Sequence, residues 1–349
     1  MMRNKIGFAI GLAVAICLLS AARTTLFAAA ANATATGDWT LSKSDEPGKV
    51  HFAVIRHEHG NHSESSSDWA LDQFQGLDMS ATARHEVKFA ISREAGKFDC
   101  EGFLDNGEGA GLFHFYPNEQ YPQQMKALGF DGIDTEKQIT MAVEDVTTEF
   151  AKQMKAEHLE GLDTDKLIAF RIFGVTTQFI EDLRRSGLNV TDSDKLVAFR
   201  IHGVTPEMVQ TLHNLGYKPD EDKLIAMRIH GATPEWIQQL SKAGYNHVDL
   251  DQLIAFRIHG VSPEFIDKLQ GLGYSHPNAD ELIAFRIHGV SPEFIGQLKD
   301  LGYSHPDPDQ LIAFRIHDVT PDFISKMRSR GMKDLTPDQL VSMRIHGID

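Results

Sequence analysis

The stretch LIAFRIHGVSPEFI, from Leu282 to Ile295, recurs with small changes along most of the chain. Its arginine returns at intervals of 29, 28, 29, 29, 29 and 29 residues, at Arg171, Arg200, Arg228, Arg257, Arg286, Arg315 and Arg344. A fixed period of about 20 to 50 residues is typical of repeat proteins, in which each unit is one supersecondary element. The sequence therefore predicts an array of repeats with a period of 29 residues.

The array extends upstream of the first complete copy. Residues 139–150 fit the same frame with Ala142 at the arginine position, as expected for a degenerate terminal unit. A lone second helix is expected before it, because residues 128–130 (Leu-Gly-Phe) match residues 301–303 (Leu-Gly-Tyr). We therefore expect the array to span residues 118–349 in about eight units of period 29.

Each unit carries the start and stop signals of two short helices, called helix A and helix B here. Helix A opens at an N-cap such as Asp307, followed by a proline and the capping-box residue Gln310, and it ends before a glycine such as Gly289. Helix B opens with Ser-Pro-Glu, as at 262–264, and stops at Gly-Tyr, as at 273–274. Each unit is therefore expected to be a helical hairpin.

Helices this short depend on their neighbours. Below about 12 to 15 residues an isolated helix is marginal in water, so every hairpin has to bury its apolar face on the next one. The core positions expected for one unit are Leu282, Ile283, Phe285, Ile287, Phe294, Ile295 and Leu298, with equivalents in the other units. The predicted product is an α-solenoid.

Residues 37–117 have the pattern of a small antiparallel β domain. Val50, Phe52 and Val54 alternate with other residues, and the turn at 105–107 (Asp-Asn-Gly) is a strong hairpin signal. We expect about three to five strands, with Trp39, Trp69, Phe74 and Leu77 as cover and Cys100 as a buried small apolar side chain rather than a nucleophile. The predicted fold class is therefore α+β, a small β domain followed by the helical-repeat array.

The first 33 residues are predicted to be a secretory signal peptide. Arg3 and Lys5 precede an uncharged apolar run over residues 6–19, which is short for a bilayer span, and small residues before Thr34 suit a signal peptidase. The mature protein is then periplasmic or secreted, and an uncleaved N-terminal anchor is the alternative. Without the leader Cys100 is the only cysteine, so no intramolecular disulfide is expected.

The charge of the chain restricts its partners. A formal net charge of −15, with no basic stripe interleaved with aromatic residues, disfavours nucleic acids and anionic lipid surfaces. No catalytic constellation is recognised in the β domain, and we expect no enzymatic activity and no cofactor. A protein or peptide of the cell envelope is the expected partner.

Paired acids open most A helices. Pairs such as Asp249 and Asp251 resemble fragments of calcium loops, but the distal bidentate glutamate that such a loop needs is missing. Asn278 and Thr336 hold the place of the first acid in two units, which suits an N-cap better than a calcium ligand. Capping is therefore the preferred interpretation.

A histidine follows the arginine two residues later in six units, at His202, His230, His259, His288, His317 and His346, and Phe173 stands there in the first well-formed unit. Neighbouring helices lie about 8 to 10 Å apart, too far for their histidines to share a zinc ion at about 2.0 to 2.1 Å. We expect no metal site. The histidines either interact with the carbonyl end of helix A or form a pH-responsive or peptide-binding row.

Two interpretations are also open for the arginines. They can pair with acids such as Glu264 or Glu293 in a ladder between repeats. Alternatively they face a groove and bind carboxylates or carbonyl groups of an extended partner chain. The candidate binding residues of this second interpretation are Arg200, Arg228, Arg257, Arg286, Arg315, His202, His230, His259 and His288.

The segment HEHGNH at 57–62 superficially resembles a metalloprotease motif. His-Glu-x-x-His places two ligands one helical turn apart, but Asn61 stands at the second ligand position. A polar loop flanked by a strand and a serine-rich loop is predicted instead.

The repeat sequence, together with FDCEG at 98–102 and GAGLFHF at 109–115, resembles the extracytoplasmic tail of bacterial β-lactam-sensor-type antirepressor metallopeptidases. The catalytic part of that family is a multi-span membrane domain with His-Glu-x-x-His, and neither occurs in this sequence, so the resemblance implies no peptidase residue. It implies a sensor or interaction tail as a free-standing exported protein. The expected function is a non-catalytic interaction scaffold that binds a peptide or protein through the repeat surface; the alternative is an extracytoplasmic sensor or regulatory partner of a membrane metallopeptidase.

Overall fold

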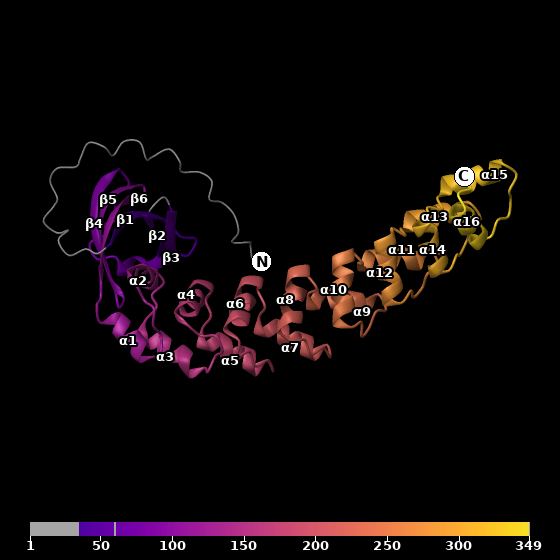
Figure 1. The fold of residues 1–349 in the computed structure, drawn as a ribbon. Helices are drawn as coiled ribbons and strands as arrows, with labels where there is room; N and C mark the ends of the chain where they lie inside the picture. Colours follow the sequence, from indigo (N-terminus) through magenta and orange to yellow (C-terminus); the bar gives the residue numbers. More distant parts are fainter. Residues whose placement is uncertain (1–34, 59–60, 349) are drawn as a thin grey trace. The chain divides into compact units, whose positions relative to one another are not determined.

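The computed structural model describes residues 35–58 and 61–348, so the predicted signal peptide lies outside the described residues (Figure 1). The chain divides into two compact units. The first comprises Met1–Gln153 with Asp163–Ile168, and the second comprises Met154–Leu162 with Ala169–Asp349. In the described residues, an antiparallel β-sheet is followed by helices in a repeated arrangement, which confirms the predicted α+β class.

The described part of the first unit contains one six-stranded antiparallel sheet with the order β3-β2-β1-β6-β5-β4. Its strands are β1 (Ala35–Lys43), β2 (Lys49–Glu58), β3 (Asn61–Ala70), β4 (His85–Arg93), β5 (Gly96–Asp105) and β6 (Glu108–Pro117), and the short 3₁₀ helix η2 (Leu71–Gln73) follows β3. The sheet has one strand more than the largest number expected, because the serine-rich segment is a strand. This strand, β3, pairs antiparallel with β2 from Lys49↔Ala70 to Glu58↔Asn61.

The prediction of a polar loop at 57–62 was therefore wrong at its two ends. Residues 57 and 58 belong to β2, and residues 61 and 62 belong to β3. β3 lies at the edge of the sheet, where polar side chains can stay in contact with water. Trp69, whose side chain is 2% exposed, anchors the far end of this strand in the core.

A cluster of aromatic rings forms the core of the sheet domain. Trp39 lies edge-on to Phe89 with ring centroids 5.0 Å apart, and Phe52 lies 5.5 Å from Trp69 and 5.6 Å from Phe74. Trp39 and Trp69 were expected as cover over the sheet, but both are strand residues. Their alternation with polar neighbours puts them on one face.

Two glycines allow the backbone of the sheet to approach Trp39. Gly102 on β5 faces Gly111 on β6, and a Cβ at Gly102 would lie 2.9 Å from the Trp39 ring and 2.3 Å from the Ala110 carbonyl oxygen. Trp39 Nε1 donates a hydrogen bond to the Glu101 carbonyl at 3.2 Å. The glycines are therefore required by this close approach.

The described residues form sixteen α-helices. They are α1 (Tyr121–Ala127), α2 (Thr135–Val143), α3 (Thr148–Ala156), α4 (Thr164–Phe173), α5 (Thr177–Arg185), α6 (Ser193–His202), α7 (Pro206–Asn214), α8 (Glu221–His230), α9 (Pro234–Lys242), α10 (Leu250–His259), α11 (Pro263–Gly271), α12 (Ala279–His288), α13 (Pro292–Asp300), α14 (Pro308–Ile316), α15 (Pro321–Ser329) and α16 (Pro337–Ile345). Helices α4 to α16 alternate between A and B type, so the even-numbered ones are A helices and the odd-numbered ones are B helices.

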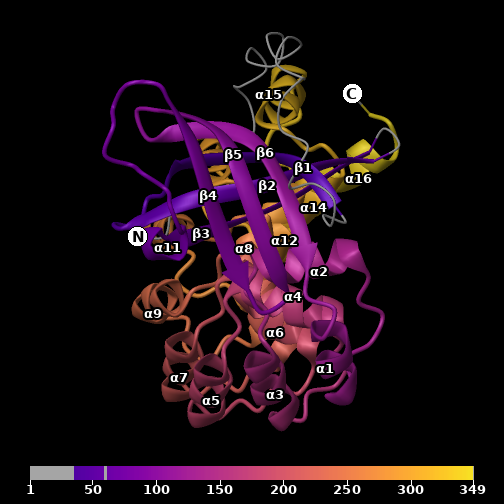
Figure 2. The ribbon, with the colours of Figure 1, turned by 90° about the vertical axis from the view of Figure 1, so that its left-hand side faces the viewer.

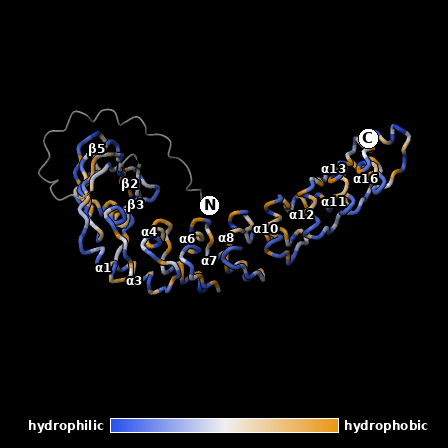
Figure 3. Tube along the Cα trace, viewed as in Figure 1, coloured by the Kyte–Doolittle hydropathy of each residue, from blue (hydrophilic) through white to orange (hydrophobic). Residues whose placement is uncertain are grey.

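Hairpins stack through like helices. Each A helix from α6 to α14 lies beside the next A helix, and α5, α7 and α9 lie side by side, as do α11, α13 and α15. Two rows of short helices result, as the second unit in Figure 1 shows. Apolar and polar segments alternate along these rows (Figure 3).

The predicted helix signals are confirmed by the cap geometry. Asp307 accepts a hydrogen bond from the Gln310 backbone at 2.8 Å, and the Gln310 side chain accepts one from the Asp307 backbone at 3.2 Å, which is a complete capping box. Asp249 likewise accepts from Gln252 N at 2.9 Å. The first acid of each pair is therefore engaged as an N-cap. At the other end, Gly289 adopts a left-handed φ of 72°, which favours glycine.

The predicted core is confirmed at five of its seven positions, and Ile283 is only partly buried. Leu282 and Phe285 are fully buried, and Phe294, Ile295 and Leu298 are at most 5% exposed. Ile287, however, is 54% exposed. Apolar residues occur on all sides of helix A, so the sequence period does not reveal which of them face the next hairpin.

Among the described residues, no helix has the length and apolar character needed to cross a membrane.

Candidate binding face of the repeat array

A row of exposed isoleucines follows the A helices. One isoleucine stands directly after each repeat arginine, and its side chain is between 53% and 58% exposed in every unit. The row consists of Ile172, Ile201, Ile229, Ile258, Ile287, Ile316 and Ile345, and we call it the isoleucine row. Single exposed apolar side chains are ordinary, whereas apolar surface that continues from one element to the next is typical of interaction sites. The A helices from α6 to α16 lie side by side, so the isoleucines recur on neighbouring helices.

An alanine lies beside the isoleucine in almost every unit. Ala284 stands three residues before Ile287, so the two share one face of α12. The same pair occurs in all seven units except the last, where Ser342 replaces alanine. These alanines are partly exposed. Each A helix therefore presents a low apolar surface next to a taller isoleucine.

The B helices supply an internal comparison. Their fifth position, which is exposed in all but one of them, is occupied in turn by Glu181, Gln210, Gln238, Asp267, the partly exposed Gly296, and Ser325. Side chains that only face water have thus diverged between repeats. Isoleucine is a poorer helix former than alanine or leucine, so helix stability does not explain its retention at an exposed site in all seven units.

The arginines next to the isoleucine row join each unit to the preceding one. Arg286 Nε donates a hydrogen bond to the carbonyl of His259 at 3.1 Å, at the end of the preceding A helix. The equivalent bonds are Arg200 to Phe173 at 2.9 Å, Arg228 to His202 at 3.0 Å, Arg257 to His230 at 3.2 Å, Arg315 to His288 at 3.3 Å and Arg344 to His317 at 3.4 Å. Each bond satisfies a carbonyl that the helix leaves without an intrahelical partner.

The guanidinium group also stacks on an aromatic ring of the preceding B helix at Arg200, Arg257, Arg286, Arg315 and Arg344. The Arg286 guanidinium lies 5.0 Å from the ring centroid of Phe265, and Arg257 lies 5.1 Å from that of Trp236. The contacts are those of a ladder between repeats, but the partners are carbonyls and rings of the preceding unit instead of the acids expected. Glu264 serves its own helix start: a hydrogen bond from Ser262 and one from its own backbone lower its pKa.

The guanidinium lies close to the glycine that ends the preceding A helix. A Cβ at Gly260 would lie 2.9 Å from Arg286 Nη2, and one at Gly289 would lie 3.1 Å from Arg315 Nη2. The same short approach occurs at Gly174, Gly203 and Gly231. We call each such arginine, with the last residue and the glycine of the preceding A helix, an arginine site.

The histidines lie at the carbonyl end of the A helices, where a positive charge is favoured. His202, His230, His259 and His288 are the last residues of their helices and are partly or fully exposed. Each follows an isoleucine of the row directly in the sequence, and their backbone carbonyls receive the arginine bonds. Structure therefore brings the predicted arginines and histidines together, while the sequence-based site omitted the isoleucines between them. The repetition of the isoleucine in every unit was the sequence signal that could have identified it as part of the site.

Titratable groups of the sheet domain form no comparable row. His57 Nε2 pairs with Asp38 Oδ2 at 2.9 Å, and no group of three or more histidine, cysteine or acidic residues suited to a metal occurs in the described ranges. The Cys100 side chain is 4% exposed, and burial raises its thiol pKa well above the ordinary value. The prediction of a buried apolar cysteine is thus confirmed.

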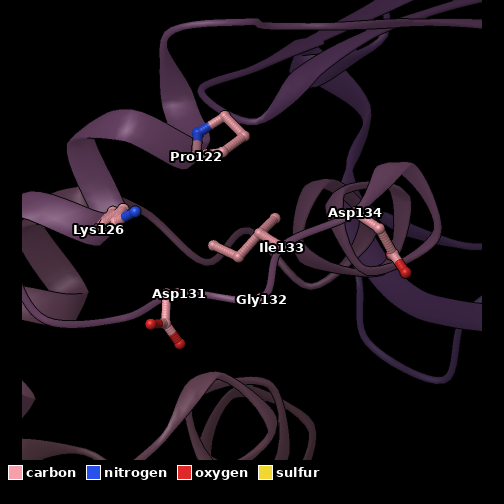
Figure 4. A pocket seen from close by; sticks show the side chains of 6 residues that line it. All are labelled: Pro122, Lys126, Asp131, Gly132, Ile133 and Asp134. Carbon is pink, nitrogen blue, oxygen red and sulfur yellow. The ribbon is translucent and has the colours of Figure 1, made fainter.

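One shallow depression of about 390 Å³ lies on the first unit. Pro122, Lys126, Asp131, Gly132, Ile133 and Asp134 line it (Figure 4). Asp134 is already engaged as the N-cap of α2, where it accepts from Lys137 N at 2.8 Å. This depression is broadly open and offers few side chains that converge on one point.

No protein-family model matches this chain, and no curated protein matches it.

Proposed function

We propose that the protein is a non-catalytic scaffold whose A face binds an extended segment of another envelope protein. The isoleucine row is the observation that carries the proposal, because an apolar residue is kept exposed in seven of seven units while the fifth position of the B helices varies. The arginines and histidines add donors along the same row. An array that presents one contact per repeat suits a partner that is also periodic.

The spacing of the helices supports an extended partner. Neighbouring helices lie about 8 to 10 Å apart. A polyproline II segment advances about 3.1 Å per residue, so every third side chain returns after about 9.3 Å on the same side. One partner side chain can therefore meet each repeat, with its apolar group above an alanine and between two isoleucines. A helix in this place would advance only about 1.5 Å per residue and match the repeat less simply.

The test compares two matched variants of the full chain. Ile258→Lys with Ile287→Lys introduces two charges on the A face, and Gln239→Lys with Gln297→Lys introduces the same charges at exposed B-helix positions. Both pairs should keep the circular dichroism of the wild type. Each protein is also prepared with a photoreactive residue at position 229, and crosslinks to solubilised envelope proteins are mapped by mass spectrometry.

We expect one partner segment to crosslink to the wild type and to the B-helix variant, and to be lost from the A-face variant. Equal crosslinking of all three proteins would overturn the proposal. The same maps test the alternative function, because a regulatory partner of a membrane metallopeptidase would crosslink to such a peptidase.

A further inference from the structure

We infer that five arginine sites of the array bind carboxylates of the partner segment, one per repeat, so that the segment is acidic as well as apolar. The sites belong to Arg200, Arg228, Arg257, Arg286 and Arg315. This inference rests on the proposed function and names the chemistry of the partner.

The sixth site shows what the other five accept. At the end of α14, Asp318 stands where the preceding units have glycine, and it adopts the same left-handed conformation with a φ of 55°. Its carboxylate pairs with the terminal guanidinium nitrogen of Arg344. Arg344 keeps its ladder bond to the His317 carbonyl and its stacking on Phe323 at 5.0 Å. A carboxylate is therefore compatible with every other contact of the site.

In the five remaining sites a glycine leaves that position open. Gly174, Gly203, Gly231, Gly260 and Gly289 lie against the guanidinium groups, and no carboxylate of the described residues lies within ion-pair distance of these five arginines. Nε donates to a helix-end carbonyl in all five, and the guanidinium face lies on an aromatic ring in all but Arg228, whereas the terminal nitrogens still have donors to offer. These guanidinium groups are held in place before a ligand arrives, which lowers the entropy cost of binding.

Charge along the A face sets the direction of the partner. Acids such as Asp251, Asp280 and Asp309 lie in the first turn at the opposite end of the A helices from the arginines. They repel carboxylates from that edge. A partner therefore places its acidic side chains at the arginine edge and its apolar side chains over the isoleucine row.

The experiment uses synthetic peptides of about 18 residues that repeat Leu-Pro-Glu, which favours the about 9.3 Å spacing of polyproline II and supplies one glutamate for each of the six sites. A control peptide repeats Leu-Pro-Gln. Affinities are measured by fluorescence anisotropy for the full chain and for Gly289→Asp, Gly289→Asn and Asp318→Gly. Gly289→Asp copies the self-occupied sixth site onto Arg315, and Gly289→Asn has the same shape without the charge and also tolerates a left-handed backbone.

We expect the glutamate peptide to bind the wild type at least tenfold more tightly than the glutamine peptide. Gly289→Asp should weaken the glutamate peptide about five- to tenfold relative to Gly289→Asn, as expected for one charge-assisted pair. Asp318→Gly should strengthen it several-fold, because it opens the sixth site. Circular dichroism should be unchanged in all three variants.

Equal affinities for the two peptides, or equal binding by Gly289→Asp and Gly289→Asn, would overturn this inference. If the Ile258→Lys, Ile287→Lys protein still loses its partner in that case, the proposed function stands and only the acidic chemistry fails. Self-association that increases in Asp318→Gly, measured by sedimentation, would assign the sites to acids of a second copy and also overturn the inference.

Discussion

Each repeat arginine supports stability through geometry as well as charge. Arg286 donates to a helix-end carbonyl and stacks on a phenyl ring, and a lysine provides neither the fork nor the planar face. We expect Arg286→Ala to lower the free energy of unfolding by about 1 to 2 kcal/mol, since the site is exposed. Arg286→Lys should recover less than half of that loss. Urea unfolding measures both.

The control for this prediction is Lys268→Ala, a change at an exposed B-helix position of the preceding unit. It should leave the midpoint of unfolding almost unchanged, because exposed charges contribute little. If Arg286→Lys were as stable as the wild type, the ladder would be a charge effect only.

The tyrosines that follow the B helices form a second link between repeats. The Tyr274 hydroxyl donates to the Pro306 carbonyl at 2.6 Å, and burial raises the pKa of Tyr274 to about 12, as it does for Tyr245. Because the folded pKa lies above the ordinary value of 10.0, the stabilisation is complete below pH 10 and is lost as the pH rises through 12. We expect alkaline unfolding within that window.

Absorbance of tyrosinate and urea unfolding between about pH 9 and pH 12 test this prediction. Tyr274→Phe removes one hydrogen bond, so it should be about 1 kcal/mol less stable at pH 9 and depend less on pH above 10. A variant with the full alkaline dependence of the wild type would show that Tyr274 does not contribute.

At the scale of the helix, the caps decide where each element begins. Asp249 accepts from Gln252 N, and Asn278 accepts from Glu281 N at 2.9 Å in the same role. We therefore expect Asp249→Asn to unfold at the wild-type urea concentration, and Asp249→Ala to cost about 1 kcal/mol. Neither calcium nor a chelator should change the thermal midpoint of the three proteins. A calcium-dependent midpoint that is lost in Asp249→Asn would favour the calcium-loop interpretation.

Caps and glycines in the sequence predicted the helix ends correctly. The sequence did not predict side-chain exposure or strand pairing, which depend on how neighbouring elements pack. Caps and glycines act within one turn, so the ends of α10 and α12 could be placed from the sequence. The exposure of Ile287 depends on how one hairpin lies on the next, and a helix with apolar residues on all sides leaves that open. β3 was missed for a related reason, because its strand state comes from pairing with β2 and not from its serine-rich sequence.

The predicted site differs from the observed one for the same reason, because its contacts also depend on packing between units. The arginine and histidine rows were visible as repeated residues, but the partner of each arginine is a backbone carbonyl of another unit, which no side-chain pattern encodes. The isoleucines were also repeated, but because they are apolar they were predicted to lie in the core. An apolar residue indicates a binding surface only when the structure shows that it is exposed together with other apolar residues.

For the whole molecule, net charge opposes the compact state. The chain carries a formal net charge of −15, and its charged links between repeats are exposed pairs such as Lys195 with Asp222 and Lys223 with Asp251. Such pairs contribute about 0 to 1 kcal/mol each. Repulsion between like charges acts along the entire array and is screened over about 10 Å at 0.1 M salt.

Added salt should therefore weaken the repulsion between the acidic residues more than it weakens the exposed ion pairs between repeats. We expect the thermal midpoint to rise when sodium chloride is increased from about 0.05 M to about 0.5 M, as measured by circular dichroism. Binding of the glutamate peptide should weaken over the same range, because its contacts are ion pairs without compensating repulsion inside the site. Stability and affinity would then respond to salt with opposite signs. A midpoint that falls with salt would instead mean that the exposed lysine and arginine links outweigh the net charge in holding the repeats together.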